Sequence, residues 1–406
     1  MQKISYKPLF TLPVVVASLG YFVDVYDLLV FNIVRVPSLT ELGLNEEQIS
    51  KIGTKILNWQ QAGLLLGGIF WGMLGDKRGR LSVLFGSIIT YSIANIACGF
   101  VNNPDVYALL RFVAGLGLAG ELGAGITLVS EILPKQLRGY GSSIVAGVGL
   151  AGAVVAFKTS TWFDWRTTYF VGGGLGLGLL LLRISVLESA LYEKEKVSNV
   201  EKGNFLSFFT DSTRLKKYLF CIGMGLPTYF VIGLLATFGN EFGKALGIQE
   251  EIKSGLCVTY VFIGTVAGDL LSGPFSHWIH SRKKAIGLMI LLALSGCVFY
   301  LLGNIKTANT FYITCGYLGF SIGYIAIFLQ MTSEQFGTNL RATATSTVAN
   351  FVRATTLITL PIYQNIKGSF GVINSALLIG AVYFTIAFIS IYFLEETIDK
   401  DLDFVE

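Results

Sequence analysis

Charged residues are scarce in this 406-residue chain: Asp, Glu, Lys and Arg make up only 14%, against about 25% in a typical soluble protein. Histidine occurs twice and proline eight times, whereas hydrophobic residues reach 53% and the mean hydropathy is +0.63. This balance excludes an ordinary soluble enzyme and a disordered chain, because so much of the sequence is suited to hydrocarbon. We therefore expect a polytopic α-helical membrane protein.

The five cysteines all lie in apolar runs, and none has the CxxC spacing of a redox or metal site. They indicate packing residues, not a disulfide framework. The sequence also lacks a P-loop, zinc-ligand spacing and a Ser–His–Asp arrangement. A net charge of +4 is too small to indicate a nucleic-acid partner. We predict no metal, no cofactor and no enzymatic activity.

Runs of about 20 mainly apolar residues predict twelve membrane-spanning helices. They cover residues 11–36, 53–74, 81–101, 105–132, 140–162, 167–187, 217–241, 254–276, 285–303, 309–332, 342–363 and 371–394. The first run contains two aspartates and no cleavage site follows it, so we interpret it as a span and not as a signal peptide. With an even number of spans, most of the 30 basic residues fall on the side of the termini. The positive-inside rule therefore predicts cytoplasmic termini.

The two halves of the chain carry similar landmarks in the same order, about 200 residues apart. Residues 131–139 and 334–342 both fit the pattern E-x-x-(small or Pro)-x-x-L-R-small. The longest hydrophilic stretch, 188–216, lies between the halves. We therefore predict a six-helix bundle over 1–187, a cytoplasmic linker, and a second bundle with a short tail over 217–406. Two similar bundles are typical of transporters that rock about a shared central cavity.

Charges inside the predicted spans are unevenly distributed. They are costly in hydrocarbon, so they normally line a cavity or pair with one another. Spans 3, 9 and 12 contain none, and span 6 contains only Arg183 near one end. The interior charges are Asp24, Asp27, Arg111, Glu121, Lys158, Asp269 and Arg353. This pattern predicts that spans 3, 6, 9 and 12 face lipid while the others line an aqueous path.

Several segments resemble a known family. Residues 72–80, GMLGDKRGR, resemble the signature loop of the major facilitator superfamily. Residues 111–121 resemble the fourth helix of its sugar, organic-ion and metabolite–proton symporter branches. Residues 20–27, GYFVDVYD, are similar to helix 1 of its metabolite, monocarboxylate and aromatic-acid carriers. The resemblance implies two pseudo-symmetric six-helix bundles and secondary transport by a monomer in the plasma membrane, as in a bacterial inner membrane.

One departure from the family bears on function. The Gly-Pro motif that antiporters carry in helix 5 is missing, since residues 146–153 read AGVGLAGA. A drug–proton antiporter is therefore the least favoured alternative.

The acids of span 1 are candidates for ion coupling. Asp24 and Asp27 are three residues apart and share one helix face. Arg111 lies in the antiparallel span 4, so we predict that Asp27 pairs with Arg111 when ionised and releases it when protonated. The resemblance agrees, since sugar–proton symporters use an Asp of helix 1 and an Arg of helix 4. Asp24 as proton carrier, Glu121 as relay, a static ion pair, and sodium as the coupled ion remain alternatives.

Arg353 is the main candidate for substrate binding. It lies near the middle of span 11, and spans 10 to 12 contain no acid at that depth to neutralise it. A guanidinium offers a fixed fork of donors to a carboxylate or phosphate. Pairing with Asp269 or with an acid of span 1 is the alternative. Further candidates are Asn350, Asn58, Gln60, Gln61, Tyr229, Tyr324, Gln330 and Lys158, although the last is also placed to snorkel.

Charged residues at the cytoplasmic ends of the spans predict a gate. Ion pairs there would close the inner side in the outward-facing state. The gate candidates are Asp76, Arg80, Glu131, Arg138, Glu188, Glu334 and Arg341. Taken together, the sequence predicts proton-coupled symport of a small carboxylate-bearing metabolite, an organic acid or an amino acid. A sugar or polyol symporter, or a carrier of cationic or zwitterionic osmolytes, is the alternative.

Overall fold

The computed structural model describes residues 7–78, 80–119, 133, 138–190, 205, 207–337 and 340–398. Helices dominate these ranges, and no strand occurs within them. The helices of the first half are α1 (Leu12–Glu41), α2 (Glu46–Arg78), α3 (Arg80–Cys98), α4 (Pro104–Leu118), α6 (Arg138–Trp162) and α7 (Trp165–Ala190). They correspond to predicted spans 1 to 6, and the second part of span 4 lies outside the described residues.

The second half has more helices than spans because three spans are interrupted. Span 7 consists of α9 (Ser212–Tyr229), the π-helix η3 (Phe230–Ala236) and α10 (Gly239–Ala245). Span 10 consists of α13 (Ala308–Ile322) and α14 (Ile325–Gln335), and span 11 of α15 (Arg341–Ala354) and α16 (Thr356–Phe370). The uninterrupted spans are α11 (Ser254–Trp278), α12 (Arg282–Leu302) and α17 (Val372–Phe393). Two short helices, η1 (Lys7–Phe10) and α8 (Ser207–Thr210), complete the described elements.

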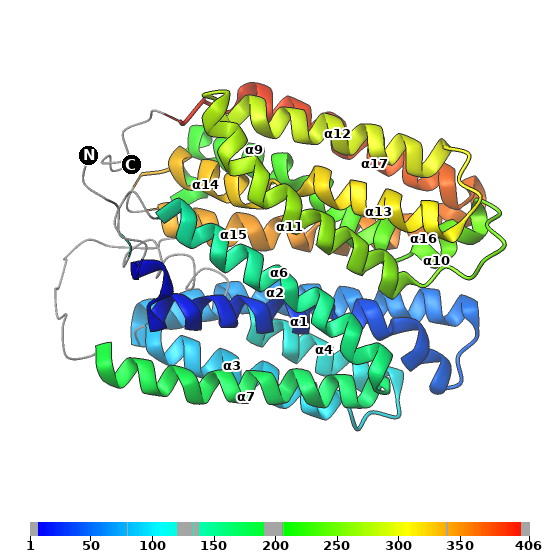
Figure 1. Ribbon diagram of the computed structural model, residues 1–406, viewed down its shortest axis with the longest axis horizontal. Helices are drawn as coiled ribbons and strands as arrows, with labels where there is room; N and C mark the ends of the chain where they lie inside the picture. The colour runs from blue at the N-terminus through cyan, green and yellow to red at the C-terminus, as the bar shows by residue number, and fades with distance from the viewer. Residues whose placement is uncertain are drawn as a thin grey trace.

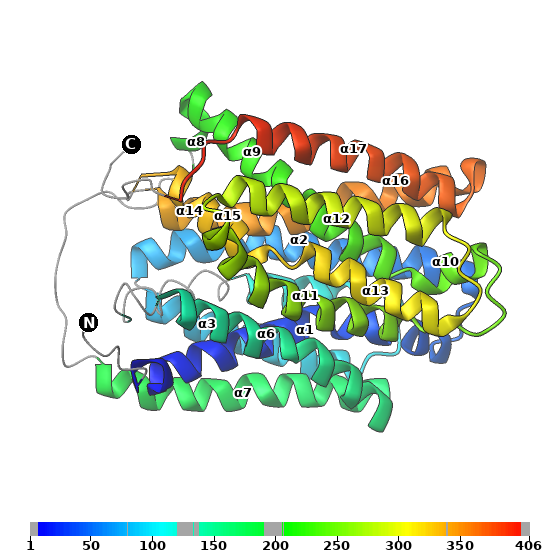
Figure 2. The same cartoon turned by 45° about the horizontal axis from the view of Figure 1, so that its top comes forward.

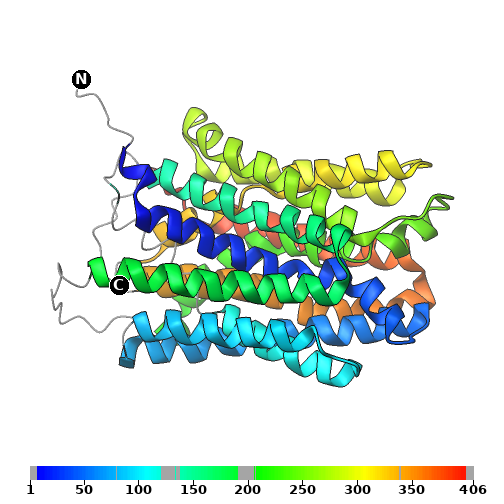
Figure 3. The ribbon, with the colours of Figure 1, turned by 60° about the horizontal axis from the view of Figure 1, so that its bottom comes forward.

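The helices run along one long axis in two groups. Figure 1 shows α1 to α7 in the lower group and α9 to α17 in the upper group, whereas in the view of Figure 2 helices of the two groups overlap. Figure 3 shows α6, in teal, between α1 and α11. The halves meet mainly through α6 on α11 and through α2 on α15 and α16. The first and last described segments lie at one end of the molecule, which we call the terminal end; the opposite end is the far end.

Glycine-mediated helix crossings repeat between the halves. A Cβ atom added to Gly63 of α2 would lie 2.0 Å from the carbonyl oxygen of Phe112 in α4. A Cβ atom added to Gly264 of α11 would lie 2.0 Å from the carbonyl oxygen of Gly316 in α13. Positions 63 and 264 are 201 residues apart, and positions 112 and 316 are 204 apart. Both crossings require a glycine at the matching position, and this similarity supports the predicted duplication.

The helices predicted to face lipid lie on the outside of the two groups. In Figure 1, α3 and α7 lie at one edge and α12 and α17 at the other. Their exposed side chains include Ile89, Ile93, Leu177, Leu181, Leu291, Val298, Val382 and Ile389. Among the described residues, six helical segments are long and apolar enough to cross a membrane by length and composition alone.

Candidate functional site

Arg111 lies at the centre of the first half and is fully buried. Its guanidinium donates to the side-chain oxygen of Asn95 at 2.7 Å and to that of Gln60 at 3.3 Å. A third hydrogen bond, of 2.8 Å, goes to the main-chain carbonyl of Asp27. Arg111 also lies over the ring of Tyr169, 5.5 Å from its centroid. Several neutral groups therefore hold this cation in place.

Asp27 and Asp24 are buried on the inner face of α1, with exposed fractions of 0% and 4%. Asp27 and Arg111 are close neighbours. One hydrogen bond between the two residues goes from the Arg111 guanidinium to the main-chain oxygen of Asp27. The carboxylate Oδ1 lies 2.6 Å from where a Cβ on Gly172 of α7 would be. The side chain of Asp27 thus occupies space that a glycine leaves open, and its role as a proton switch stays a prediction.

Arg353 is buried where the two halves meet. Its Nε donates to the hydroxyl of Tyr229 at 2.7 Å, while its Nη1 is buried without a hydrogen-bond partner. The hydroxyl of Tyr21, from α1, is an electrostatic neighbour of Arg353, Asp269 and Asp24 at once. The structure therefore gathers the ionisable groups of spans 1, 8 and 11 at one place. The sequence analysis identified Arg353, Asp269 and Asp24 as charges inside the spans, but it gave no reason to include Tyr21.

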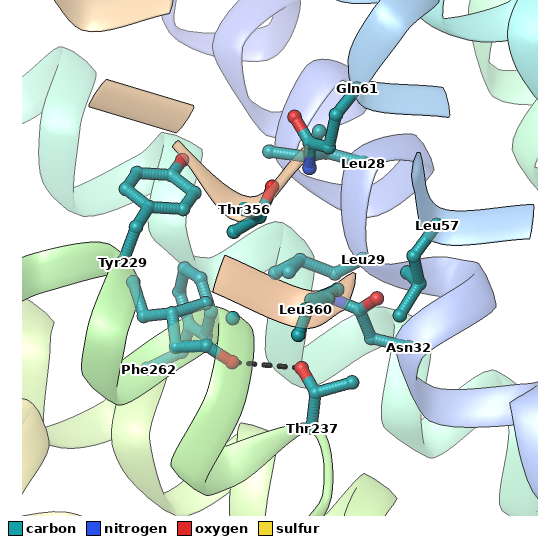
Figure 4. Close-up of a pocket in the computed structure, with 12 residues that line it drawn as sticks. Leu28, Leu29, Asn32, Leu57, Gln61, Tyr229, Thr237, Phe262, Thr356 and Leu360 are labelled. Atoms are coloured by element: carbon teal, nitrogen blue, oxygen red, sulfur yellow. Dashed lines mark hydrogen bonds between the residues drawn. The ribbon is translucent and has the colours of Figure 1, made fainter. Parts of the chain in front are cut away.

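A cavity with an empty volume of about 420 Å³, part of it open to solvent, lies between the halves. Its polar lining consists of Asn32 and Gln61 from the first half and Tyr229, Thr237 and Thr356 from the second (Figure 4). The remaining lining is apolar: Leu28, Leu29, Leu57, Ile232, Gly233, Phe262 and Leu360. The wall thus offers few polar groups.

The two threonines of the lining use their hydroxyls within the protein. Thr237 donates to the carbonyl of Ile232 at 2.8 Å, and Thr356 donates to the carbonyl of Arg353 at 2.8 Å. By contrast, the side-chain oxygens of Asn32 and Gln61 are buried without a hydrogen-bond partner. The sequence analysis missed Asn32, although a polar residue five positions after Asp27 in an apolar helix was an available signal.

The π-helix η3 forms one wall of this cavity and contributes Ile232 and Gly233. Pro227 precedes it by three residues and lacks the N–H that a regular helix needs. The wider turns of a π-helix change the directions in which side chains project, and such turns are common at functional sites.

The other predicted substrate residues lie in different surroundings. Asn350 and Asn58 each have a side-chain oxygen without a hydrogen-bond partner, and the amide of Asn350 packs against Gly68 of α2. Tyr324 is buried and donates to the carbonyl of Met224 at 3.1 Å, so it does not line the cavity. Lys158 is exposed, as expected for a snorkelling side chain.

Polar contacts join the halves at the far end. Arg35 of α1 is buried; it donates to the carbonyl of Thr237 at 2.9 Å and stacks on Phe238 at 4.3 Å. Ser50 of α2 donates to Glu241 at 2.7 Å, and Lys367 of α16 reaches both Ser50 at 2.8 Å and Glu241 at 2.9 Å. We call Ser50, Glu241 and Lys367 the far-end latch. These contacts connect the two halves at the far end.

At the terminal end, the described gate residues make contacts within the second half. Glu334 of α14 forms a buried ion pair with Arg282 of α12, with N–O distances of 2.7 and 2.8 Å. Arg341 donates to the carbonyl of Ser333 at 3.0 Å. The sequence analysis did not identify Arg282 as the partner of Glu334. Six other predicted residues, or their side chains, lie outside what the structure describes: Asp76, Arg80, Glu121, Glu131, Arg138 and Glu188.

Glu396 follows α17 and caps the start of α12. Its carboxylate accepts from the hydroxyl of Ser281 at 2.5 Å and from the N–H of Arg282 at 2.9 Å. Burial alone would raise the pKa of Glu396. However, the bonds from Ser281 and from the N–H groups of Arg282, Thr397 and Lys283 outweigh burial and hold that pKa below its usual value. The cap therefore connects the end of α17, the last helix of the described residues, to the start of α12.

Comparisons with known proteins identify the family. The model of the Major Facilitator Superfamily matches residues 17–361. The sialic acid transporter of Escherichia coli is 25% identical over 342 residues, which are 82% of each chain. The putative niacin/nicotinamide transporter of Bacillus subtilis is 26% identical over 360 residues, 83% of this chain and 84% of the relative. The cis,cis-muconate transport protein of Acinetobacter baylyi is 26% identical over 400 residues, 94% of this chain and 93% of the relative. The chain therefore belongs to the major facilitator superfamily and is a multi-pass membrane transport protein, not an enzyme.

Proposed function

We propose that this protein is a proton-coupled symporter that takes up a small carboxylate-bearing metabolite by alternating access. One observation carries the proposal: Arg353 is a buried cation with a free Nη1 donor, bonded to a tyrosine that lines the cavity. An unsatisfied guanidinium donor in a dry site is costly. A substrate carboxylate next to Tyr229 would satisfy that donor and accept a charge-assisted hydrogen bond.

The cavity favours an acid with few other polar groups. Two lining amides have free oxygens, and the rest of the wall is apolar or already hydrogen-bonded. A sugar or polyol carries many hydroxyls and would leave most of them unpaired in this site. Related proteins named as transporters of niacin/nicotinamide, cis,cis-muconate, gentisate and benzoate point to the same class of substrate. A zwitterionic or cationic osmolyte remains the second candidate because Asp24 lies near Tyr21.

We assign proton coupling to Asp27, next to Arg111. Protonation of a buried carboxylate removes a charge that otherwise interacts with the nearby guanidinium. The two groups are electrostatic neighbours in the structure, which supports this assignment. Asp24 is the alternative carrier, and sodium is the alternative ion.

The far-end contacts indicate the direction of opening. We propose that the terminal end is cytoplasmic, so that the far-end latch closes the outer side of a monomer in a bacterial inner membrane. In this state the substrate site is shut from outside. Opening would require Ser50 to separate from Glu241 and Lys367.

Uptake into proteoliposomes tests the function. Purified protein would be given an acidic exterior and a panel of nicotinate, benzoate, cis,cis-muconate, an amino acid, a sugar and a betaine. We expect accumulation of an acid that depends on the pH gradient and persists without sodium. Arg353→Gln should reduce uptake at low substrate concentration by about 10- to 100-fold, since a charged hydrogen bond is worth about 1.5–3 kcal/mol.

A matched control is Lys306→Gln, which removes an exposed cation from a far-end loop and should leave uptake unchanged. Preferential uptake of the sugar or the betaine would contradict the proposed substrate class. Sodium-driven uptake that ignores pH would contradict the proposed coupling.

A further inference from the structure

Asp269 occupies an unusual position in the second half. It lies within α11 and is only 6% exposed. Its Oδ1 accepts the N–H of Ala326 at 3.0 Å, and the N–H of Ile325 is also directed at the carboxylate. These amides belong to the first turn of α14 and have no partner within that helix. Asp269 therefore caps a half-helix that begins inside the bundle.

Glycine contacts fix this arrangement. A Cβ added to Gly323, at the break between α13 and α14, would lie 2.6 Å from the Cα of Gly268 and 2.8 Å from the nitrogen of Asp269. The backbones of α11 and of the break thus approach closely. The residue that precedes α14, Tyr324, makes no side-chain cap of its own. The start of α14 consequently depends on a carboxylate from a neighbouring helix.

The charge of Asp269 matters for this cap. An ionised carboxylate stabilises the positive end of a helix, and its hydrogen bonds are stronger than those of a neutral acceptor. The ionisable groups that share its surroundings, on α1, α9 and α15, are Tyr21, Asp24, Tyr229 and Arg353, and Asp27 lies one helical turn after Asp24. The remaining charged groups on helices packed against α11 lie toward its ends, and include Arg35, Glu41, Lys158, Glu241, Lys244, Arg282, Lys283, Lys284 and Glu334.

The other end of α14 is also held by an ionised group. Glu334 pairs with Arg282 of α12 and accepts from Gln330 at 3.1 Å. Between its two ends, α14 contacts α6 of the first half. This 11-residue helix is therefore a short element with charged attachments at both ends and a contact across the two halves.

We propose that Asp269 is a proton-binding residue of the second half, and that its protonation loosens the start of α14 and so changes the contact between α14 and α6. Proton release restores the charged cap and fixes the half-helix again. The link to transport rests on the proposed proton symport, whereas the protonation-dependent cap does not. Asp269 would act beside Asp27, in the opposite half.

Hydrogen exchange tests the cap without any substrate. The full-length protein in lipid nanodiscs would be followed between pH 5 and 8, with exchange corrected for its intrinsic pH dependence. We expect peptides covering 325–330 to lose protection on acidification by about 3- to 10-fold, the range given by a helix-end charge in a partly buried setting. Asp269→Asn keeps an acceptor for Ala326 but cannot titrate, so its protection should not vary with pH. Asp269→Glu should restore a pH dependence.

The first turn of α4 provides an internal control, because the amide side chain of Asn103 caps it at 2.7 Å and does not titrate. Its protection should be independent of pH in every variant. If wild type shows no pH dependence at 325–330, or if Asp269→Asn shows the same dependence as wild type, Asp269 does not bind the proton that controls α14.

Transport separates this proposal from the proposed function. Using the acids of the uptake panel, Asp269→Asn should retain exchange between equal internal and external pools. Its gradient-driven accumulation should fall by up to about tenfold per pH unit of gradient, the equivalent of one lost proton. Wild-type uptake that does not depend on the pH gradient would refute the proton symport. In that case the hydrogen-exchange experiment alone would decide whether the cap depends on protonation of Asp269. Coupled wild-type uptake with equal accumulation by Asp269→Asn would refute the link between Asp269 and transport.

Discussion

The far-end latch gives a prediction whose size follows from the structure. Glu241 of α10 accepts from Ser50 of α2 at 2.7 Å and pairs with Lys367 of α16 at 2.9 Å. The side chains of Lys367 and Glu241 are 21% and 17% exposed, so water screens them only partly. Glu241→Gln removes the charge and retains similar volume. We expect it to shift the protein toward a state that is open at the far end.

The magnitude can be estimated from the number of bonds lost. A hydrogen bond to a charged group contributes about 1.5–3 kcal/mol, and glutamine retains part of that through its neutral oxygen. A net loss of about 1–2 kcal/mol changes the ratio of closed to open protein by roughly 5- to 30-fold. The pair Lys244–Glu46 lies near the latch, but its side chains are 65% and 84% exposed. Lys244→Gln therefore serves as a control and should change the ratio less than about fivefold.

Double electron–electron resonance measures this ratio. Spin labels at Thr40→Cys and Gln249→Cys would report the separation of α1 from the loop after α10, because both positions are exposed. All five native cysteines are buried, so the label should go to the introduced thiols. We expect Glu241→Gln to add a population at longer distance. An unchanged distance distribution, or equal opening by Lys244→Gln, would refute the reasoning.

Three further predictions concern coupling, stability and packing. Asp27→Asn should lower pH-driven accumulation in proteoliposomes by up to about tenfold per pH unit of gradient while substrate exchange between equal pools survives, and intact accumulation would rule out Asp27 as a coupling residue. Glu334→Ala leaves Arg282 buried without its partner and should lower stability by about 3–5 kcal/mol, seen as a lower thermal midpoint that Arg282→Met partly restores. Gly264→Val should prevent α11 from packing on α13, because its Cβ would lie 2.0 Å from a carbonyl oxygen; Gly273→Ala, with nothing within 4 Å, should express and fold normally.

Hydropathy and charge made the spans predictable. Each of the twelve apolar runs overlaps one or more helices of the structure, and three of the charge-free runs form α3, α12 and α17 on the outside. These features depend on local composition, which a sequence displays directly. The duplication was visible for the same reason, since loop motifs repeat at a nearly constant spacing.

The interruptions in the second half were not predictable by the same means. The break at Gly323 and Tyr324 requires the close approach of Gly268 and a cap from Asp269 to Ala326, which are 57 positions apart in sequence. A hydropathy average does not reveal such a break, because the residues before it and the residues after it are both apolar. The partner of Glu334 was missed for a related reason: Arg282 reads as one of three consecutive basic residues, and only the fold brings it next to α14.

Similar glycine-mediated packing supports different chemistry in the two halves. In the first half, Arg111 is held by Asn95, Gln60 and a main-chain carbonyl, among helices that are continuous where described. In the second half, Arg353 ends α15 next to a break and keeps a free donor. A cation fixed by several neutral acceptors is suited to hold its position, whereas a cation with a free donor on an interrupted helix is suited to receive a ligand. Arg353→Lys should raise the substrate concentration needed for half-maximal uptake, whereas Arg111→Lys should mainly lower stability and maximal rate. The three donors of a lysine leave a single nitrogen, so they cannot reach the three acceptors that Arg111 contacts through three different nitrogens.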